Sequence, residues 1–245
     1  MLKHPTLEKL SAMRFAGMSA ALEEQMQTPD IDELSFEERL GLLLDREQAV
    51  RETNRMKSRL RKAKLRQQGS VEDIDFKHPR GLDKSLILRL ADCQWIKNHN
   101  NIMITGPTGT GKSYLACAFA QKACREGFSA LYLRTAKLFE DMSLAKGDGR
   151  YLKLLTSFAK TDLLILDDYG LVPLNQEQRH NLLEILEDRH NLKSTLMTSQ
   201  MPVENWHERI GDPTIADAIL DRVVHNAHKI KLEGDSMRKK TAILT

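Results

Sequence analysis

Residues 101–113, with the sequence NIMITGPTGTGKS, limit the possible folds more than any other segment. The apolar run at 101–105 predicts a short buried strand, and the spacing of apolar residues at 112–125 predicts a helix. The loop between them matches the pattern G-x-x-x-x-G-K-S/T. In such loops, backbone N–H groups surround a phosphate and the positive end of the following helix faces it. The segment therefore predicts a nucleotide phosphate site in a strand–loop–helix unit.

The residues of this loop have separable roles. Lys112 is expected to contact the β- and γ-phosphates, and Ser113 to bind Mg²⁺ through its hydroxyl. ATP and Mg²⁺ are therefore the expected cofactors. The alternative, a glycine-rich turn without a ligand, does not explain why a strand precedes the loop and a helix follows it. The predicted nucleotide-binding residues are Gly106, Pro107, Thr108, Gly109, Thr110, Gly111, Lys112, Ser113 and Tyr114.

Polar residues end two further predicted strands. Asp167 and Asp168 follow the apolar run at 163–166, and Gln200 follows a strand pattern at 195–198. In a parallel sheet, ligands bind beyond the carboxyl ends of the strands. We therefore expect Asp167 to hold Mg²⁺, Asp168 to orient or deprotonate the attacking water, and Gln200 to lie near the γ-phosphate. The alternative for the two acids is a pair of helix caps at a strand-to-helix turn.

Short apolar segments alternate with helical patterns from about residue 71 onward. Strands are predicted at 101–105, 130–133, 162–166, 194–198 and 228–232, and helices lie between them. Buried strands that alternate with helices form a parallel sheet covered on both faces. The predicted fold class is α/β, with a five-stranded parallel sheet between helices in a domain at 71–245. A helix is also expected at 82–98.

The first part of the chain, 1–70, shows only helical patterns and is predicted to be a small all-helical domain. Apolar residues recur at helical spacing from Leu7 to Leu22. Ser35, with Glu38 three residues later, is a capping-box signature for a second helix. This helix is expected to continue through a basic segment to about Gln67.

Composition excludes several classes of protein. No apolar run approaches the roughly 20 residues of a membrane-spanning helix, and the N-terminus lacks the apolar core of a signal peptide. The three cysteines, Cys93, Cys117 and Cys124, have neither metal-binding nor redox spacing. We therefore expect a cytoplasmic, nucleoid-associated protein without a membrane partner.

Positive charge is concentrated in one segment, although the formal net charge is only +3. Residues 51–66 contain eight Lys or Arg and one acid, and the bases at 51, 55, 59, 62 and 66 recur on one helical face. The segment has no aromatic residue, which favours contact with a duplex phosphate backbone over base stacking. A solvated charged helix is the alternative. The predicted DNA-contacting residues are Arg51, Arg55, Arg59, Arg61, Lys62, Lys64 and Arg66, with Lys137, Lys146 and Arg150 as a second set.

Five segments together resemble AAA+ ATPases, and in particular the IstB-like group, the helper ATPases of IstA/IstB-type insertion sequences. They are GPTGTGKSYLA (106–116), DLLILDDYG (162–170), TSQMPVENWHE (198–208), ILDRVVH (219–225) and LEGDSMR (232–238). The similarity extends to FEERLGLLLDREQAVRETNR (36–55) and so covers nearly the whole chain. The group is related to the DnaC/DnaI helicase loaders.

The resemblance implies catalytic roles that the local patterns leave open. Gln200 occupies the sensor-1 position, Arg222 the position of an arginine finger that enters a neighbouring subunit's site, and Arg238 the sensor-2 position. Composition alone would assign either arginine to the ordinary surface. Asp168 departs from the Glu usual in AAA+ proteins, so we expect slow, switch-like hydrolysis. The chain stops soon after Arg238, and most of a C-terminal lid domain is therefore expected to be absent.

The resemblance also implies a function and partners. The expected function is an ATP-dependent regulator of transposition, which assembles as a homo-oligomeric ring or spiral on double-stranded DNA and assists a cognate transposase. The first alternative is a helicase-loading ATPase of the DnaC/DnaI type, whose N-terminal part binds a replicative helicase. A small-molecule kinase would need a substrate pocket and a lid that the sequence does not indicate. A purely structural DNA binder would assemble without Lys112.

Overall fold

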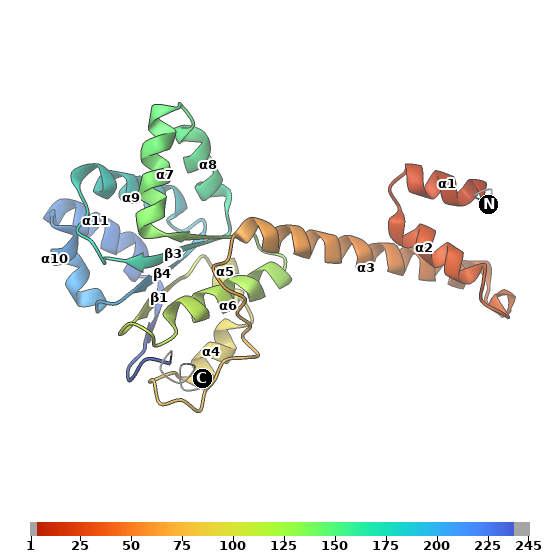
Figure 1. Cartoon of the computed structure of the whole chain (residues 1–245), viewed down its shortest axis with the longest axis horizontal. Coiled ribbons are helices and arrows are strands. Elements are labelled where there is room, and N and C mark those ends of the chain that lie inside the picture. The colour runs from red at the N-terminus through yellow and green to blue at the C-terminus, as the bar shows by residue number, and fades with distance from the viewer. Residues whose placement is uncertain (1–3, 238–245) are drawn as a thin grey trace, which may run out of the picture. The chain divides into compact units, whose positions relative to one another are not determined.

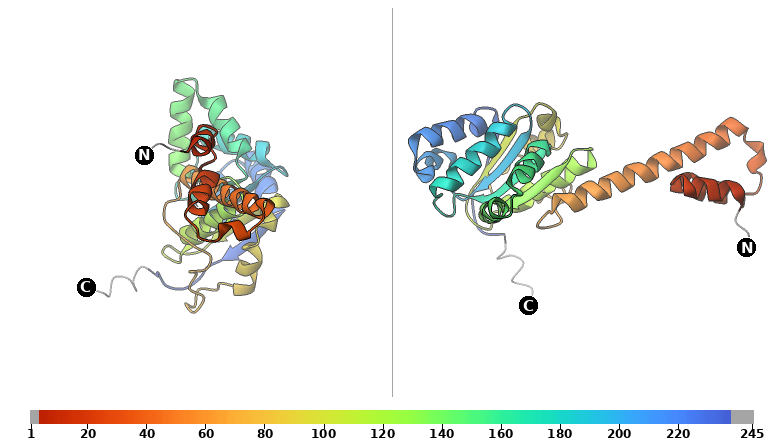
Figure 2. Two further views of the ribbon diagram at one scale, coloured as in Figure 1. Left: turned by 90° about the vertical axis from the view of Figure 1, so that its right-hand side faces the viewer. Right: turned by 90° about the horizontal axis from the view of Figure 1, so that it is seen from above.

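The computed structural model describes residues 4–237, and its contacts divide the chain into two compact units, with the division between Ser58 and Arg59. This division lies within α3 (Phe36–Ala63), a continuous helix (Figure 2), and comes earlier than the expected boundary at residue 70. The last turn of α3 packs with the second unit, since Ala63 is fully buried there and Arg59 donates a hydrogen bond of 2.8 Å to the Cys124 carbonyl. Within residues 4–237, no helix is both long and apolar enough to cross a membrane.

The second unit contains a five-stranded parallel sheet with the strand order β2-β3-β4-β1-β5. Its strands are β1 (Asn101–Thr105), β2 (Ala130–Arg134), β3 (Leu163–Tyr169), β4 (Ser194–Ser199) and β5 (Ala227–Lys231). The predicted fold class and the predicted number and direction of strands are thus confirmed. The carboxyl ends of β1, β3 and β4, three adjacent strands, carry the loop and the polar residues that the sequence singled out.

Helices cover both faces of this sheet (Figure 1). One face carries α4 (Lys84–Leu90), α5 (Gln94–Lys97) and α6 (Lys112–Arg125). The other face carries α7 (Thr135–Gly147), α8 (Tyr151–Lys160), α9 (Gln176–Arg189), α10 (Trp206–Ile210) and α11 (Pro213–Val224). A short 3₁₀ helix, η2 (Val203–Asn205), comes directly before α10. Successive strand residues point to opposite faces. Ile102 and Ile104 therefore join the core around α6, while Met103 joins the core on the opposite face.

Left-handed residues break or end three predicted helices. The pattern at 7–22 forms α1 (Pro5–Ala12) and α2 (Ala16–Gln25), with Arg14 at φ 61° between them. The pattern at 82–98 forms α4 and α5, with Cys93 at φ 60° between them. The helix α3 ends at Ala63 because Lys64 adopts φ 51°. Gly and Asn are the usual residues in this conformation, so these sequences carry no local signal for the breaks.

In the first unit, a buried carboxylate joins α2 to α3. Between these helices lie η1 (Ile31–Glu33) and the predicted capping box, in which the Ser35 backbone donates to Glu38 at 2.8 Å. Glu47 of α3 accepts hydrogen bonds from the Gly17 N–H (2.7 Å) and the Met18 N–H (3.1 Å) in the first turn of α2. Anions at a helix N-terminus are stabilising. This contact brings the two helix backbones together at Gly17.

Gly17→Ala should destabilise the first unit, whereas Gly41→Ala should not. A Cβ at residue 17 would lie 2.6 Å from the Glu47 Cα, so α2 and α3 would have to separate, at a cost of about 1–3 kcal/mol. A Cβ at residue 41, on α3, would meet no atom within 4 Å, and loss of a helical glycine stabilises by about 0.5–1 kcal/mol. Amide hydrogen exchange over 16–25 in the full chain measures both effects. Equal protection in the two variants would contradict this packing.

Candidate nucleotide-binding site

The loop Gly106–Ser113 connects β1 to α6, as predicted, and its glycines have no room for side chains. Gly106 has φ 145°, and a Cβ there would lie 2.2 Å from the Leu232 carbonyl oxygen. Gly109 and Gly111 also have positive φ, at 83° and 96°. Such angles strain residues other than glycine. The backbone conformation and the helix that follows therefore fit the phosphate cradle that the motif predicts.

The first residue of α6 lies against this loop. The Lys112 ammonium donates hydrogen bonds to the carbonyls of Gly106 (2.6 Å) and Pro107 (2.7 Å). Its side chain is almost fully buried, so the positive charge is fixed beside the loop. A phosphate in the loop would meet this ammonium together with the backbone N–H groups.

The carboxylate of Asp167 lies in the interior at the carboxyl end of β3, with none of its surface exposed. It accepts hydrogen bonds from three hydroxyls on three different elements: Ser113 on α6 (2.8 and 3.0 Å), Tyr132 on β2 and Thr198 on β4. Burial raises the pKa of Tyr132, and Asp167 raises it further, so the phenol remains a donor. A buried charge is tolerated when it is hydrogen-bonded in this way.

Ser113 and Asp167 supply the oxygen ligands that Mg²⁺ prefers. Among residues 4–237, no three His, Cys, Asp or Glu side chains cluster as a metal site. Mg²⁺ in nucleotide sites characteristically takes one or two protein ligands and completes its shell with phosphate oxygens and water. The residues present therefore fit Mg²⁺ bound together with a nucleotide, held by Ser113 and Asp167, with Lys112 on the phosphates.

A β-bulge gives the two neighbouring acids different environments. Asp167 and Asp168 of β3 together face the single residue Thr198 of β4. Asp168 adopts φ 60°, and its N–H donates to the Thr198 hydroxyl at 3.1 Å. Bulges next to active sites re-aim side chains in this manner. Asp tolerates the left-handed conformation better than most residues, which gives a physical reason for Asp rather than Glu at position 168.

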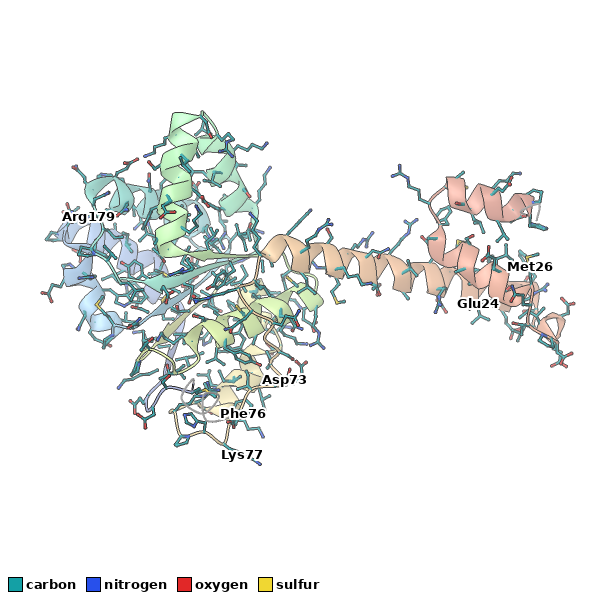
Figure 3. All side chains as sticks on the ribbon, viewed as in Figure 1. Glu24, Met26, Asp73, Phe76, Lys77 and Arg179 are labelled. Atoms are coloured by element: carbon teal, nitrogen blue, oxygen red, sulfur yellow. The ribbon has the colours of Figure 1, made fainter. Side chains whose placement is uncertain are left out.

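A cavity of about 580 Å³ lies over the loop, a volume within the usual range for ligand sites. Asp73, on the linker between α3 and α4, is labelled in Figure 3 and contributes to its wall. Asp168 and the predicted Gln200 and Tyr114 line the same cavity. The full lining is Arg66, Gln67, Asp73, Asp75, Arg80, Thr108, Gly109, Gly111, Lys112, Ser113, Tyr114, Asp168, Leu171, Gln200 and Met237.

Comparison with known proteins agrees with this geometry. A family model described as IstB-like ATP binding protein matches residues 8–245. The chain belongs to this IstB-like family. It is 53% identical over 239 residues to the putative insertion sequence ATP-binding protein y4pL of Sinorhizobium fredii, covering 98% of each chain. It is 30% identical over 240 residues to the insertion sequence IS21 putative ATP-binding protein of Pseudomonas aeruginosa, covering 96% of this chain and 91% of that one.

Solved structures share the fold of this IstB-like protein. DnaI aligns with a TM-score of 0.56 at 23% identity, covering 72% of this chain and 93% of its own. The replication initiator DnaA bound to AMPPCP and single-stranded DNA aligns with a TM-score of 0.56 at 17% identity, covering 70% of this chain and 52% of its own. At these identities the likeness concerns the fold alone. The expected family is confirmed, and so is the expected fold, a five-stranded parallel sheet between helices.

Two arginines that the sequence did not assign to this site face the acid pair. The Arg66 Nη1 lies 3.8 Å from an oxygen of Asp167 and 3.8 Å from an oxygen of Asp168. The Arg134 Nε lies 3.5 Å from Asp168. The early end of α3 places Arg66 at the nucleotide cavity, and its predicted contact with DNA stays a prediction. Arg134 is the last residue of β2, which pairs with β3. It directly follows the predicted strand at 130–133, and this position at a strand end was a signal that could have assigned Arg134 to the site.

Arg80 is a further residue that the sequence did not single out. Only 2% of its surface is exposed, and it donates hydrogen bonds to the carbonyls of Thr110 (3.0 Å) and Asp75 (3.1 Å). A Cβ at Gly111 would lie 2.5 Å from its guanidinium. Arg80 therefore packs directly against the phosphate loop and ties it to the linker that precedes α4.

The predicted arginine finger lies away from the cavity of its own chain. Arg222 on α11 pairs with Glu187 on α9 and donates to the Ala218 carbonyl at 2.9 Å. The hydrogen bond with Glu187 raises the pKa of Arg222, so it carries its charge throughout the physiological range. A contact with a neighbouring subunit stays a prediction. The predicted sensor-2 residue, Arg238, lies outside the described residues.

The predicted DNA-contacting bases divide into two groups. Within the basic segment, Arg51 pairs with Glu47 at 2.6 Å, and Arg59 and Arg66 make the contacts given above. The second predicted set is also paired within the chain: Lys137 with Glu140 and Asp141, Lys146 with Glu177, and Arg150 with Asp148. Other bases of the segment are exposed and form no ion pair with any residue in 4–237. They are the predicted Arg55, Arg61, Lys62 and Lys64, together with Lys57, which was not among the predicted contacts.

Gly106→Ala should weaken the binding of a fluorescent ATP analogue by about tenfold or more, because the new Cβ would displace the Leu232 backbone that packs on the loop. Gly127→Ala is the matched control. Gly127 also has a positive φ, of 98°, but a Cβ there meets no atom within 4 Å. We expect this control to bind the analogue with the affinity of the unaltered protein. Equal affinities in the two variants would show that the close packing at Gly106 does not shape the phosphate site.

Proposed function

We propose that this IstB-like protein is a Mg²⁺-dependent ATPase whose nucleotide state controls an oligomer on double-stranded DNA and thereby assists a transposase. The observation that carries the proposal is the convergence of Lys112, Ser113 and Asp168 on one cavity, with the buried Asp167 hydrogen-bonded to Ser113 behind its wall. Its relatives are named as insertion sequence ATP-binding proteins, which supports a role in transposition.

The hydrolytic roles follow from the positions of the side chains. Bound Mg²⁺ would neutralise charge on the phosphates, and Ser113 and Asp167 would hold it. Asp168 borders the cavity and is proposed to orient the attacking water, with Gln200 near the γ-phosphate. Arg66 and Arg134 compete with water for the Asp168 carboxylate. We therefore propose slow hydrolysis, suited to a switch.

A second copy of the chain is proposed to complete the site. Arg222 lies outside the cavity of its own chain, and its charge is maintained by Glu187. An arginine supplied by a neighbour can accelerate phosphoryl transfer by roughly 10³–10⁵. ATP would then favour a ring or spiral, with Arg238 as a further proposed contact to the nucleotide.

Duplex DNA is the proposed polyanion. Five exposed bases of the segment 55–64 have no acidic partner within residues 4–237, and the segment lacks aromatic side chains. Contacts of this kind neutralise phosphates without reading the base sequence. The helical N-terminal part is therefore proposed to bind DNA and to contribute to oligomer contacts, and a cytoplasmic, nucleoid-associated location would follow.

Lys62→Ala should make duplex binding less sensitive to salt. Each phosphate contact contributes about 0.9 to the slope of log affinity against log salt concentration, so removal of Lys62 should reduce the slope by about that amount. Lys137→Ala is the matched control, because Lys137 is already paired with Glu140 and Asp141. Anisotropy titrations of a labelled duplex at several KCl concentrations give both slopes. An unchanged slope for Lys62→Ala, or an equal fall in both variants, would argue against this DNA surface.

A helicase loader of the DnaC/DnaI type remains the second candidate, because DnaI shares the fold. Affinity capture separates the two functions. We expect the tagged protein, incubated with AMPPCP, Mg²⁺ and duplex DNA, to retain its cognate transposase and not a hexameric replicative helicase. Lys112→Ala should lose this retention, because the phosphates would no longer be held. Capture of the helicase without the transposase would replace the proposed function with the alternative.

A further inference from the structure

Arg66 connects the acid pair of the nucleotide cavity to the basic end of α3. Its guanidinium lies 3.8 Å from both Asp167 and Asp168. The exposed Lys62 and Lys64 precede it by four and two positions in the sequence. Arg66 is 44% exposed, so it borders solvent and is not locked into the core. A hydrogen bond with Tyr132 and the two carboxylates raise the pKa of Arg66, which therefore stays charged.

The linker that carries Arg66 is fixed at both ends. At one end, Ala63 is fully buried and Lys64 turns the chain through its left-handed conformation. At the other end, Gly69 packs against the first turns of α6, where a Cβ would lie 3.1 Å from the Tyr114 carbonyl oxygen. The Tyr114 hydroxyl also donates to the Ser70 carbonyl at 3.4 Å. A change in the position of Arg66 must therefore be taken up by the few residues between these anchors.

Arg66 and a divalent cation would compete for one carboxylate. The residues that fit Mg²⁺ are Ser113 and Asp167, and Asp167 is also a partner of Arg66. Two positive charges beside the same carboxylate repel each other. Asp168 would keep Arg134, at 3.5 Å, if Arg66 withdrew. The acid pair can thus release Arg66 without leaving Asp168 unpaired. Binding of Mg²⁺ with a nucleotide would therefore make the Arg66–Asp167 contact less favourable.

We propose that Arg66 couples occupancy of the nucleotide cavity to duplex binding by the bases around the end of α3, namely Lys62 in its last turn and Lys64 just after it. The inference rests on the proposed function and names its regulation. The ion pairs of Arg66 with Asp167 and Asp168 hold the linker toward the acids. A loaded cavity displaces the Arg66 guanidinium, which then joins the already exposed Lys62 and Lys64 at phosphates of the duplex. By linkage, duplex DNA that engages the displaced Arg66 must favour nucleotide binding by the same factor.

The test is a thermodynamic cycle with the full-length protein. Duplex affinity is measured with and without saturating AMPPCP and Mg²⁺, and AMPPCP affinity is measured with and without duplex over a range of Mg²⁺ concentrations. For the unaltered protein we expect a coupling factor of about 5–150, typical of linked sites. Arg66→Ala should bring this factor close to one. It should also lower the Mg²⁺ concentration needed to bind AMPPCP without DNA, because the competing charge is gone.

Three further variants make the result specific. Arg66→Lys keeps a positive charge at the acids and should retain the Mg²⁺ requirement of the unaltered protein. Arg61→Ala is the matched control, because it removes an exposed base of the same helix that has no acidic partner within residues 4–237. It should weaken duplex binding equally with and without AMPPCP and leave the coupling factor unchanged. Arg66→Gln, which preserves side-chain length, replaces Arg66→Ala if the alanine variant does not fold.

The outcomes separate this inference from the proposed function. If the unaltered protein does not bind duplex DNA, or binds it identically in both nucleotide states, the proposed function fails. If coupling is present and Arg66→Ala retains it, only the role of Arg66 is overturned. A rise in the Mg²⁺ requirement of Arg66→Ala would also overturn it, because loss of a merely structural contact weakens the site whereas loss of a competitor strengthens it.

Discussion

The buried carboxylate of Asp167 is the interaction on which the rest of the site depends. Its hydroxyl partners come from α6, β2 and β4, so the sheet order and the placement of α6 must both be correct before the charge is satisfied. An unpaired buried charge would be very costly, and this cost links the fold to the chemistry. The same carboxylate is the proposed ligand of Mg²⁺ and a partner of Arg66, so the proposed metal site and the linker meet at one side chain.

The phosphate loop is supported by segments that lie far apart in the sequence. Arg80, before α4, packs against Gly111 and donates to Thr110, while Leu232, after β5, packs against Gly106. The Met237 N–H donates to the Gly109 carbonyl at 2.9 Å. A loop whose glycines are enclosed from both sides is held in its binding conformation before a ligand arrives, which lowers the entropic cost of binding.

Sequence patterns predicted the parts of this protein whose structure is determined by residues close together in the sequence. The strand–loop–helix unit around Lys112 and the parallel sheet follow from local spacing, and both are confirmed. Patterns could not predict contacts made across the fold. The stripe of bases suggested that Arg59 and Arg66 face outward together, yet each has a partner whose position depends on packing between elements. The breaks at Arg14 and Cys93 were also hidden, since neither residue type favours a left-handed turn.

The pair formed by Arg222 and Glu187 has a consequence for assembly. In a single chain, this arginine already has an anionic partner, so a proposed contact with a neighbour would exchange one anion for another. Exposed ion pairs contribute only about 0–1 kcal/mol, so the exchange is nearly neutral unless the new partner carries more charge than a carboxylate. A triphosphate carries more negative charge than a carboxylate, and a diphosphate exceeds the carboxylate by a smaller amount. The subunit contact would therefore respond to the number of phosphates in the adjoining site, and release of one phosphate would return the arginine to its own chain.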